Sequence, residues 1–240
     1  MRVESTDGMK LRVHGTGPDQ AQRRPSLMLS PGDDVWCRID AARAAVGVDD
    51  CATVVLTSMQ REQVSGLLDL RDGAPIDLYA TPAVFEHLTL TLPLLPVLQQ
   101  FCGVQWHLIP VAGEQRAAEF TVKRLPSLAF TALTTADAAA GERIALAVRD
   151  ERSQARLFVV HGKSLDSAAF DSMLDWMQGA DCVVIDRAEH TNGVHDKRWL
   201  ERLAQLPATR KLLLDTIGSD RALLAACGIE CAQGMLEFEL

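Results

Sequence analysis

The sequence predicts an α/β sandwich in which two mixed β-sheets pack face to face and helices cover their outer faces. Two observations lead to this fold class. Each half of the chain begins with strand-like runs and continues with alternating helices and buried strands, the order expected of layered mixed sheets. The 240 residues are also 48% apolar and 23% charged, which is enough to bury a substantial core. We therefore expect one domain over residues 1–240, with two similar halves at roughly 1–118 and 119–240.

In the first half, turn residues and helix-start signals separate the expected elements. The Pro-Gly-Asp-Asp run at 31–34 predicts the turn of a hairpin. Thr81 followed by Pro82 predicts a helix start, with Thr81 as the N-cap and proline in the first turn. The expected order is a strand over 9–14, a hairpin over 26–39, a strand over 53–57, a helix over 62–70, a strand over 76–80, a helix from 82, and a strand over 104–109.

The second half repeats this order. It begins with an alternating, strand-like run over 120–134 that contains a break at Pro126. The remaining expected strands are 143–150, 156–161, 182–186, 211–215 and 235–238, and the expected helices are 166–177, 196–206 and 219–227.

Composition excludes two classes of function. The formal net charge is -8 and basic residues do not cluster beyond pairs, so we expect no binding to nucleic acid. The first ten residues carry charges where a secretory signal needs an apolar core, and the apolar run 88–98 is interrupted by Pro93 and Pro96 and is too short to span a bilayer. We expect a soluble, cytoplasmic protein without membrane contact, in which 88–98 forms core or dimer-facing helices.

The segment most informative about function follows the strand at 53–57. The apolar run 54–56 ends in Thr57, a polar loop follows, and Gly66 opens an amphipathic helix. This frame resembles the metal-binding loop of the metallo-β-lactamase superfamily, whose members carry H-x-H-x-D-H at this place. The resemblance implies the αββα fold of that superfamily.

The ligand positions of that loop carry other residues in this chain. They fall on Ser58, Gln60, Glu62 and Gln63, and none of these is histidine. The last-histidine position of the pattern, after the strand at 211–215, falls on Asp215. We therefore expect a degenerate metal site.

Further segments resemble a narrower family, that of pyrroloquinoline quinone (PQQ) biosynthesis protein B. They are LTSMQREQVSGLLDLRDGAPIDLYATPAVFEHL, with Gln60 at a position where that family also has glutamine, and the C-terminal QGMLEFEL. The family's N-terminal glycine-rich loop and zinc-binding cysteine cluster are missing here. The resemblance implies a role in PQQ assembly, for which iron-dependent hydroxylation of a precursor tyrosine and cofactor transport have both been proposed.

Other side chains could still form a metal site at the same rim. Glu62, Asp186 and Asp215 are hard oxygen donors, and a set of Asp186, His190, His195 and Asp215 is chemically acceptable for zinc or iron. His161 ends the strand 156–161 and is a further candidate. The structural alternative is that the aspartates end strands or cap turns and the loop histidines are solvated.

Two functions therefore compete. The first is a non-catalytic or altered protein that handles a small molecule resembling a PQQ precursor, or a partner protein, with a homodimer possible and no cofactor. The alternative is a metal-dependent hydrolase or oxygenase that uses Zn, Fe or Mn around Asp186, His190, His195 and Asp215. A different α/β fold with parallel-only sheets is the third possibility.

Overall fold

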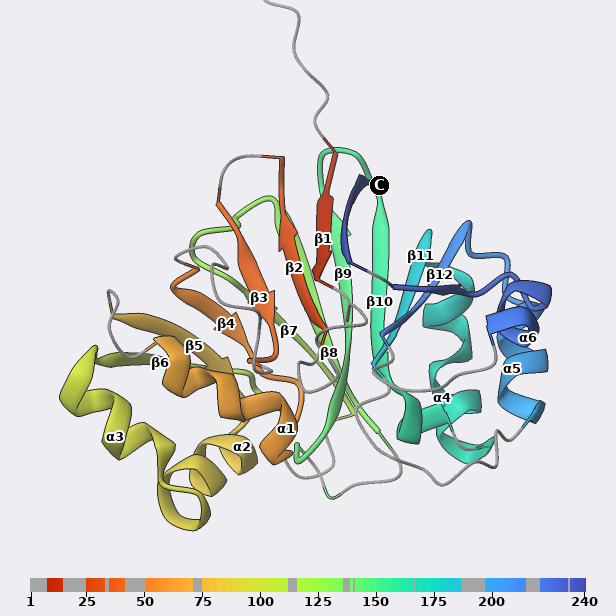
Figure 1. The fold of residues 1–240 in the computed structure, drawn as a ribbon. Helices are drawn as coiled ribbons and strands as arrows, with labels where there is room; N and C mark the ends of the chain where they lie inside the picture. The colour runs from red at the N-terminus through yellow and green to blue at the C-terminus, as the bar shows by residue number, and fades with distance from the viewer. Residues whose placement is uncertain are drawn as a thin grey trace, which may run out of the picture.

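Two mixed β-sheets form the centre of the molecule in a computed structural model of the chain (Figure 1). The structure describes residues 8–14, 25–32, 35–41, 51–70, 75–111, 116–135, 139, 141–165, 167–186, 197–214, 221–232 and 234–240.

Within these residues, the first sheet has seven strands in the order β14-β1-β2-β3-β4-β5-β6. Strands β14, β1, β2 and β3 pair antiparallel, and β3 to β6 pair in parallel. The strands are β1 (Lys10–His14), β2 (Ser26–Ser30), β3 (Cys37–Ile39), β4 (Thr53–Val55), β5 (Ile76–Ala80), β6 (Val104–Leu108) and β14 (Met235–Glu239).

The second sheet, counted over the same described ranges, has seven strands in the order β13-β12-β11-β10-β9-β8-β7. Strands β7 to β10 pair antiparallel, and β10 to β13 pair in parallel. The strands are β7 (Ala117–Thr121), β8 (Leu128–Thr134), β9 (Ile144–Asp150), β10 (Arg156–His161), β11 (Cys182–Asp186), β12 (Arg210–Leu214) and β13 (Glu230–Cys231). Both sheets are mixed, which excludes a parallel-only fold.

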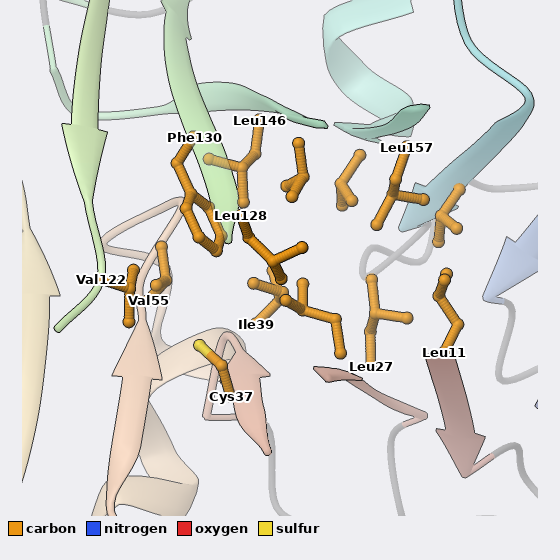
Figure 2. Packing of buried hydrophobic residues seen from close by; sticks show 14 of the residues in the cluster. Leu11, Leu27, Cys37, Ile39, Val55, Val122, Leu128, Phe130, Leu146 and Leu157 are labelled. Carbon is orange, nitrogen blue, oxygen red and sulfur yellow. The ribbon is translucent and has the colours of Figure 1, made fainter. Parts of the chain in front are cut away.

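The main core lies between the two sheets (Figure 2). Alternate residues of each strand point inward, so Leu11 and Ile39 of the first sheet face Phe130 and Leu146 of the second. These four side chains are at most 4% exposed. The apolar residues that recur at every second position of these strands therefore form the inner faces of the two sheets.

Helices cover the outer face of each sheet, so the predicted αββα sandwich is confirmed. On the first sheet, Val64, Leu67 and Leu98 pack against Val54 and Leu78. The elements of that layer are α1 (Arg61–Val64), the 3-10 helix η1 (Ser65–Leu70), α2 (Pro82–Glu86), the π-helix η2 (His87–Thr91) and α3 (Leu94–Phe101). The second sheet is covered by α4 (Ser167–Gln178), which follows the 3-10 turn η3 (Gly162–Leu165), and by α5 (Lys197–Ala204) and α6 (Arg221–Ala226). No helix within the described residues is long and apolar enough to cross a membrane.

The helix predicted over 62–70 differs from the structure. It is α-helical over Arg61–Val64 and then tightens to a 3-10 helix. The reason is competition for backbone hydrogen bonds: the Gln63 carbonyl accepts from the Ala41 N–H at 2.6 Å, and the Gly66 N–H donates to the Ala41 carbonyl at 2.6 Å. The bonds that would continue the α-helix are replaced by contacts to the chain segment after β3.

The C-terminal strand also lies where the linear order does not place it. β14 joins the first sheet and pairs with β1 in antiparallel register, with Lys10 opposite Glu239. The second half of the sequence therefore contributes one strand to the sheet of the first half. The two-residue strand β13 was not predicted from the sequence.

Candidate functional site

A chain of hydrogen-bonded polar side chains crosses from one sheet to the other at one rim of the sandwich. Asp40 follows β3, Thr57 lies two residues after β4, and Gln63 belongs to α1. His161 and Asp186 are the last residues of β10 and β11, where they face each other in the parallel register. Carboxyl ends of parallel strands meet at one edge of a sheet, which is why these side chains converge. We call these five residues the rim network.

Thr57 and His161 connect the two sheets. The Thr57 hydroxyl lies 2.6 Å from Asp40 Oδ2 and 2.6 Å from His161 Nε2, and the Thr57 N–H donates to Asp40 Oδ1 at 2.7 Å. Thr57 and His161 are 2% and 5% exposed. The contact is therefore shielded from water, and hydrogen bonds in the protein interior are electrostatically stronger than hydrogen bonds in water.

Gln63 closes the network on the other side of the imidazole. Its Nε2 lies 3.1 Å from His161 Nδ1 and donates to Asp186 Oδ2 at 3.1 Å. The His161 Nδ1 to Asp186 Oδ2 distance is 3.7 Å. The amide of Gln63 thus stands between the imidazole and the carboxylate.

One protonation pattern satisfies all these contacts. The Gln63 amide donates to His161 Nδ1, the Nε2–H of a neutral His161 donates to the Thr57 hydroxyl, and that hydroxyl donates to Asp40 Oδ2. The tautomer is assigned from the hydrogen bonds of the neighbours. Each donor in the chain has one acceptor, so the network orders the rim across both sheets.

Asp40 is the buried acceptor at the end of this chain. It is 6% exposed and has a φ of 58°, a left-handed conformation that aspartate tolerates better than most residues. Burial raises the pKa of the Asp40 carboxyl to about 7, the hydrogen bonds from Thr57 oppose the rise, and the charge of Asp186 adds to it. Asp40 therefore exchanges a proton near neutral pH.

The positions of the loop pattern do not share one environment. Ser58 is buried, its hydroxyl accepts from the Gln60 N–H at 3.1 Å, and its backbone bridges to Arg143. The Glu62 carboxylate lies 3.7 Å from the Arg61 guanidinium and is 29% exposed. Among the four loop positions, Gln63 is the one that contacts His161 and Asp186 through its side chain in the described part of the chain.

Three predicted site residues, His190, His195 and Asp215, lie outside the described residues. The expectation that they form a metal site with Asp186 stays a prediction.

The superfamily that the loop resembles implies a metal at this rim, and the described side chains do not fit a tetrahedral zinc site. Both ring nitrogens of His161 have protein partners, so in the tautomer assigned above the imidazole has no free lone pair. In the described part of the chain, no three His, Cys, Asp or Glu side chains are grouped to hold an ion. A zinc site needs at least three such ligands.

Asp40 and Thr57 are the members of the network that the sequence did not indicate as site residues. Asp186 ends the apolar strand β11, whereas Arg38 interrupts the apolar pattern of β3 before Asp40. The sequence pattern around Thr57 indicates only the end of a strand. Thr57 contacts His161, 104 positions later in the chain, and Asp40 is bonded to Thr57, so the link to His161 depends on the packing of the sheets.

Comparison with known proteins adds family relationships to this geometry. The family model described as "Beta-lactamase superfamily domain" matches residues 31–214. Coenzyme PQQ synthesis protein B of Pseudomonas aeruginosa (strain LESB58) is 30% identical over 228 residues, an alignment that covers 78% of this chain and 73% of that protein. The protein of the same name from Klebsiella pneumoniae (strain 342) is 33% identical over 192 residues, covering 67% of this chain and 60% of that protein.

Solved structures match the fold at lower identity. Zn²⁺-bound PqqB from Methylobacterium extorquens superposes with a TM-score of 0.65 at 17% identity, over 96% of this chain and 100% of that one. The metallo-β-lactamase fold protein YhfI from Bacillus subtilis superposes with a TM-score of 0.67 at 14% identity, over 97% of this chain and 100% of that one. At these identities the matches show the fold alone.

Proposed function

This chain belongs to the metallo-β-lactamase superfamily, in the family of coenzyme PQQ synthesis protein B, and we propose that it binds a small polar molecule at the rim network without a metal. The molecule we favour resembles PQQ or a precursor of it, because the relatives are named for the synthesis of PQQ. The observation that carries the proposal is the position of Gln63. It occupies the last ligand position of the loop pattern, and its amide is hydrogen-bonded to His161 and Asp186.

The unsatisfied Gln63 Oε1 favours a ligand with hydrogen-bond donors. Gln63 Oε1 is buried and has no hydrogen-bond partner among the described residues. Buried acceptors almost always have a donor, so an N–H or O–H group from a ligand or a water molecule would complete the network. Asp186 is 19% exposed at its side chain and provides a carboxylate that reaches the solvent. These features support binding of a molecule with amine or hydroxyl groups.

Catalysis by a zinc-bound water would need a different donor set. It requires a metal held by several neutral imidazoles or carboxylates with one open position. The neutral His161 is instead both donor and acceptor within the protein. The described part of the rim therefore favours binding over hydrolysis.

The test combines metal analysis with a binding measurement. Protein purified without chelator is analysed by inductively coupled plasma mass spectrometry, and tyrosine, a precursor-like probe with an amine and a hydroxyl group, is titrated into it by calorimetry. We expect tyrosine binding at less than 0.1 metal per chain, and at least tenfold weaker binding in Gln63→Leu and in Asp186→Asn, on the order of one lost charge-assisted hydrogen bond. Gln178→Leu, an exposed glutamine on α4, is the matched control and is expected to bind like the wild type. Equal binding by all four proteins would refute the rim as the site.

One observation favours the alternative, a metal-dependent hydrolase or oxygenase around Asp186, His190, His195 and Asp215. Asp186 ends β11 at the rim, with a partly exposed carboxylate. Stoichiometric zinc, iron or manganese in the purified protein, lost in Asp186→Ala and in His195→Ala, would support this alternative and contradict metal-free binding.

A further inference from the structure

The edge of the first sheet at β6 has unusual chemistry for a strand edge. β6 is the last strand of that sheet and pairs on one side with β5. Segment 87–111, which contains η2, α3 and β6, has no Asp, Glu, Lys or Arg, although 23% of the whole chain is charged. At one end of the sheet, in the yellow-green part of Figure 1, these elements form the outermost layer. A long surface segment therefore lacks the charged side chains that normally keep such a segment in contact with water.

Large apolar side chains are exposed on this run. Trp106 is 38% exposed on β6, and its ring stacks on Phe85 of α2 with 4.0 Å between ring centroids. We define the β6 surface as Leu90, Val97, Phe101, Trp106 and Leu108, which are 72%, 39%, 62%, 38% and 50% exposed. Five exposed large apolar side chains within residues 90–108 favour an interaction site.

The other three edge strands of the two sheets, among the strands that the structure describes, differ from β6. β14 carries Glu237 and Glu239, β7 carries Glu119, and β13 is two residues long and carries Glu230. Charges and short length are the devices that keep edge strands from pairing with other chains. β6 has neither device.

The hydrogen-bonding phase of β6 shows which backbone groups face outward. The Ile76 N–H donates to the Gly103 carbonyl, and the Ile109 N–H donates to the Ala80 carbonyl, so odd-numbered residues of this segment face β5. Backbone groups alternate in direction along a strand, so those of Trp106 and Leu108 point away from the sheet. They can pair with a further strand.

The occupant that fits this edge is a second copy of the chain. Two copies each carry a net charge of -8, so most of their surfaces repel each other. Contact through the uncharged segment 87–111 brings them together where repulsion is weakest. An antiparallel pair of two β6 strands is also self-complementary, as a two-fold interface requires.

We propose that the chain forms a two-fold symmetric dimer by antiparallel pairing of β6 with β6 of a second copy, with the β6 surface of each copy buried. With the symmetry axis at Trp106, the N–H and carbonyl of Trp106 pair with those of the same residue in the partner copy. The two seven-stranded sheets then join into one continuous sheet. The α3 helices of the two copies lie on the same side of this sheet, where Val97 and Phe101 become covered.

The first experiment measures mass in solution by size-exclusion chromatography with light scattering and by sedimentation velocity. We expect twice the chain mass of 26.2 kDa at micromolar concentration. Leu108→Glu and Leu90→Glu are expected to weaken the dimer at least tenfold. The matched control is Met235→Glu, which replaces a residue 71% exposed on the charged edge strand β14 and is expected to leave the dimer intact. Circular dichroism and thermal unfolding show that the variants are folded.

Two further readouts distinguish this interface from other modes of association. Amide hydrogen exchange at Trp106 and Leu108 is expected to slow as the protein concentration rises, because these N–H groups pair in the dimer. The dimer is also expected to tighten between 20 and 300 mM salt, because salt screens repulsion between two chains of charge -8. A wild-type monomer at 100 µM, or a dimer disrupted by Met235→Glu but not by Leu108→Glu, would overturn the proposal.

Discussion

The Asp40 carboxyl makes the stability of this protein depend on pH near neutrality, and Asp40→Asn removes that dependence. Burial raises the pKa of Asp40 from 3.8 in the unfolded chain to about 7 in the folded one. The folded state therefore binds the proton more tightly. The contribution of Asp40 to the free energy of unfolding is present in full below pH 3.8 and is lost as the pH rises through about 7.

The size of the effect follows from the two pKa values. One pKa unit corresponds to about 1.4 kcal/mol, so the whole contribution is about 4 kcal/mol at low pH. Between pH 6 and pH 8 the same two values give a loss of about 1.4 kcal/mol. This window stays above the isoelectric point of about 5.2, where the chain is least soluble.

Asparagine at position 40 resembles the protonated carboxyl. Its oxygen accepts from the Thr57 N–H, and its amide donates to the Thr57 hydroxyl, which then donates to His161 Nε2 in the other tautomer of the imidazole. Urea unfolding of both proteins at pH 6, 7 and 8 measures the difference in free energy of unfolding. We expect the variant to gain about 1.4 kcal/mol on the wild type across this range. Unfolding energies of the two proteins that run parallel to within about 0.5 kcal/mol would refute the reasoning.

Three further predictions concern stability, measured by urea unfolding. Gln63→Leu and His161→Phe should each lower the free energy of unfolding by about 1 to 3 kcal/mol. The loss in the double variant should differ from the sum of the two single losses by at least about 0.5 kcal/mol, because the two side chains share a hydrogen bond. Additive losses would show that the two side chains do not interact. Met9→Ala should lower the free energy of unfolding by about 2 to 5 kcal/mol, because Met9 is 0% exposed in the core. The same change at Met235, which is 71% exposed, should alter it by no more than about 0.5 kcal/mol. Equal losses would contradict the assignment of Met9 to the core. Gly141→Ala should lower the free energy of unfolding more than Gly103→Ala does. Both glycines have a positive φ, so both substitutions strain the backbone. A Cβ at position 141 would lie 3.0 Å from the Val111 carbonyl oxygen, whereas the atom nearest to a Cβ at position 103 would be 3.9 Å away. The reverse order would show that backbone strain outweighs the close contact.

Local sequence signals predicted many elements closely. The strands β5, β10 and β11 have the predicted bounds, because each is a short apolar run between polar or turn residues. The N-cap of α2 is also confirmed: the Thr81 hydroxyl accepts from the Val84 N–H at 3.3 Å, and it donates to the Gly141 carbonyl at 2.5 Å. Capping is decided within four residues, so it can be predicted from sequence alone.

Signals failed where a distant segment competes for the same backbone groups. The predicted helix over 62–70 ends early as an α-helix because Ala41 takes part in its hydrogen bonds. The placement of β14 beside β1 depends on two segments more than 200 positions apart. Neither contact leaves a periodic pattern in the sequence.

The candidate site divides in the same way. The sequence indicated Gln63, His161 and Asp186 from a loop pattern and from two strand ends, and their contacts are present in the structure. It did not show that the Gln63 amide lies between His161 and Asp186, or that Asp40 and Thr57 complete the network. Residue type is local information, while the distance between side chains 98 or 123 positions apart is fixed by sheet packing.

By itself, the sequence determined the αββα sandwich class, the inward faces of most strands, and the absence of histidine from the loop positions Ser58, Gln60, Glu62 and Gln63. These follow from residue type and from periods of two and 3.6 residues. The tertiary structure alone decided strand order, the exposed uncharged edge at β6, and the hydrogen bonds that tie Asp40 through His161 to Asp186. The physical reason is that pairing and burial depend on which surfaces meet, and segments remote in the chain supply those surfaces.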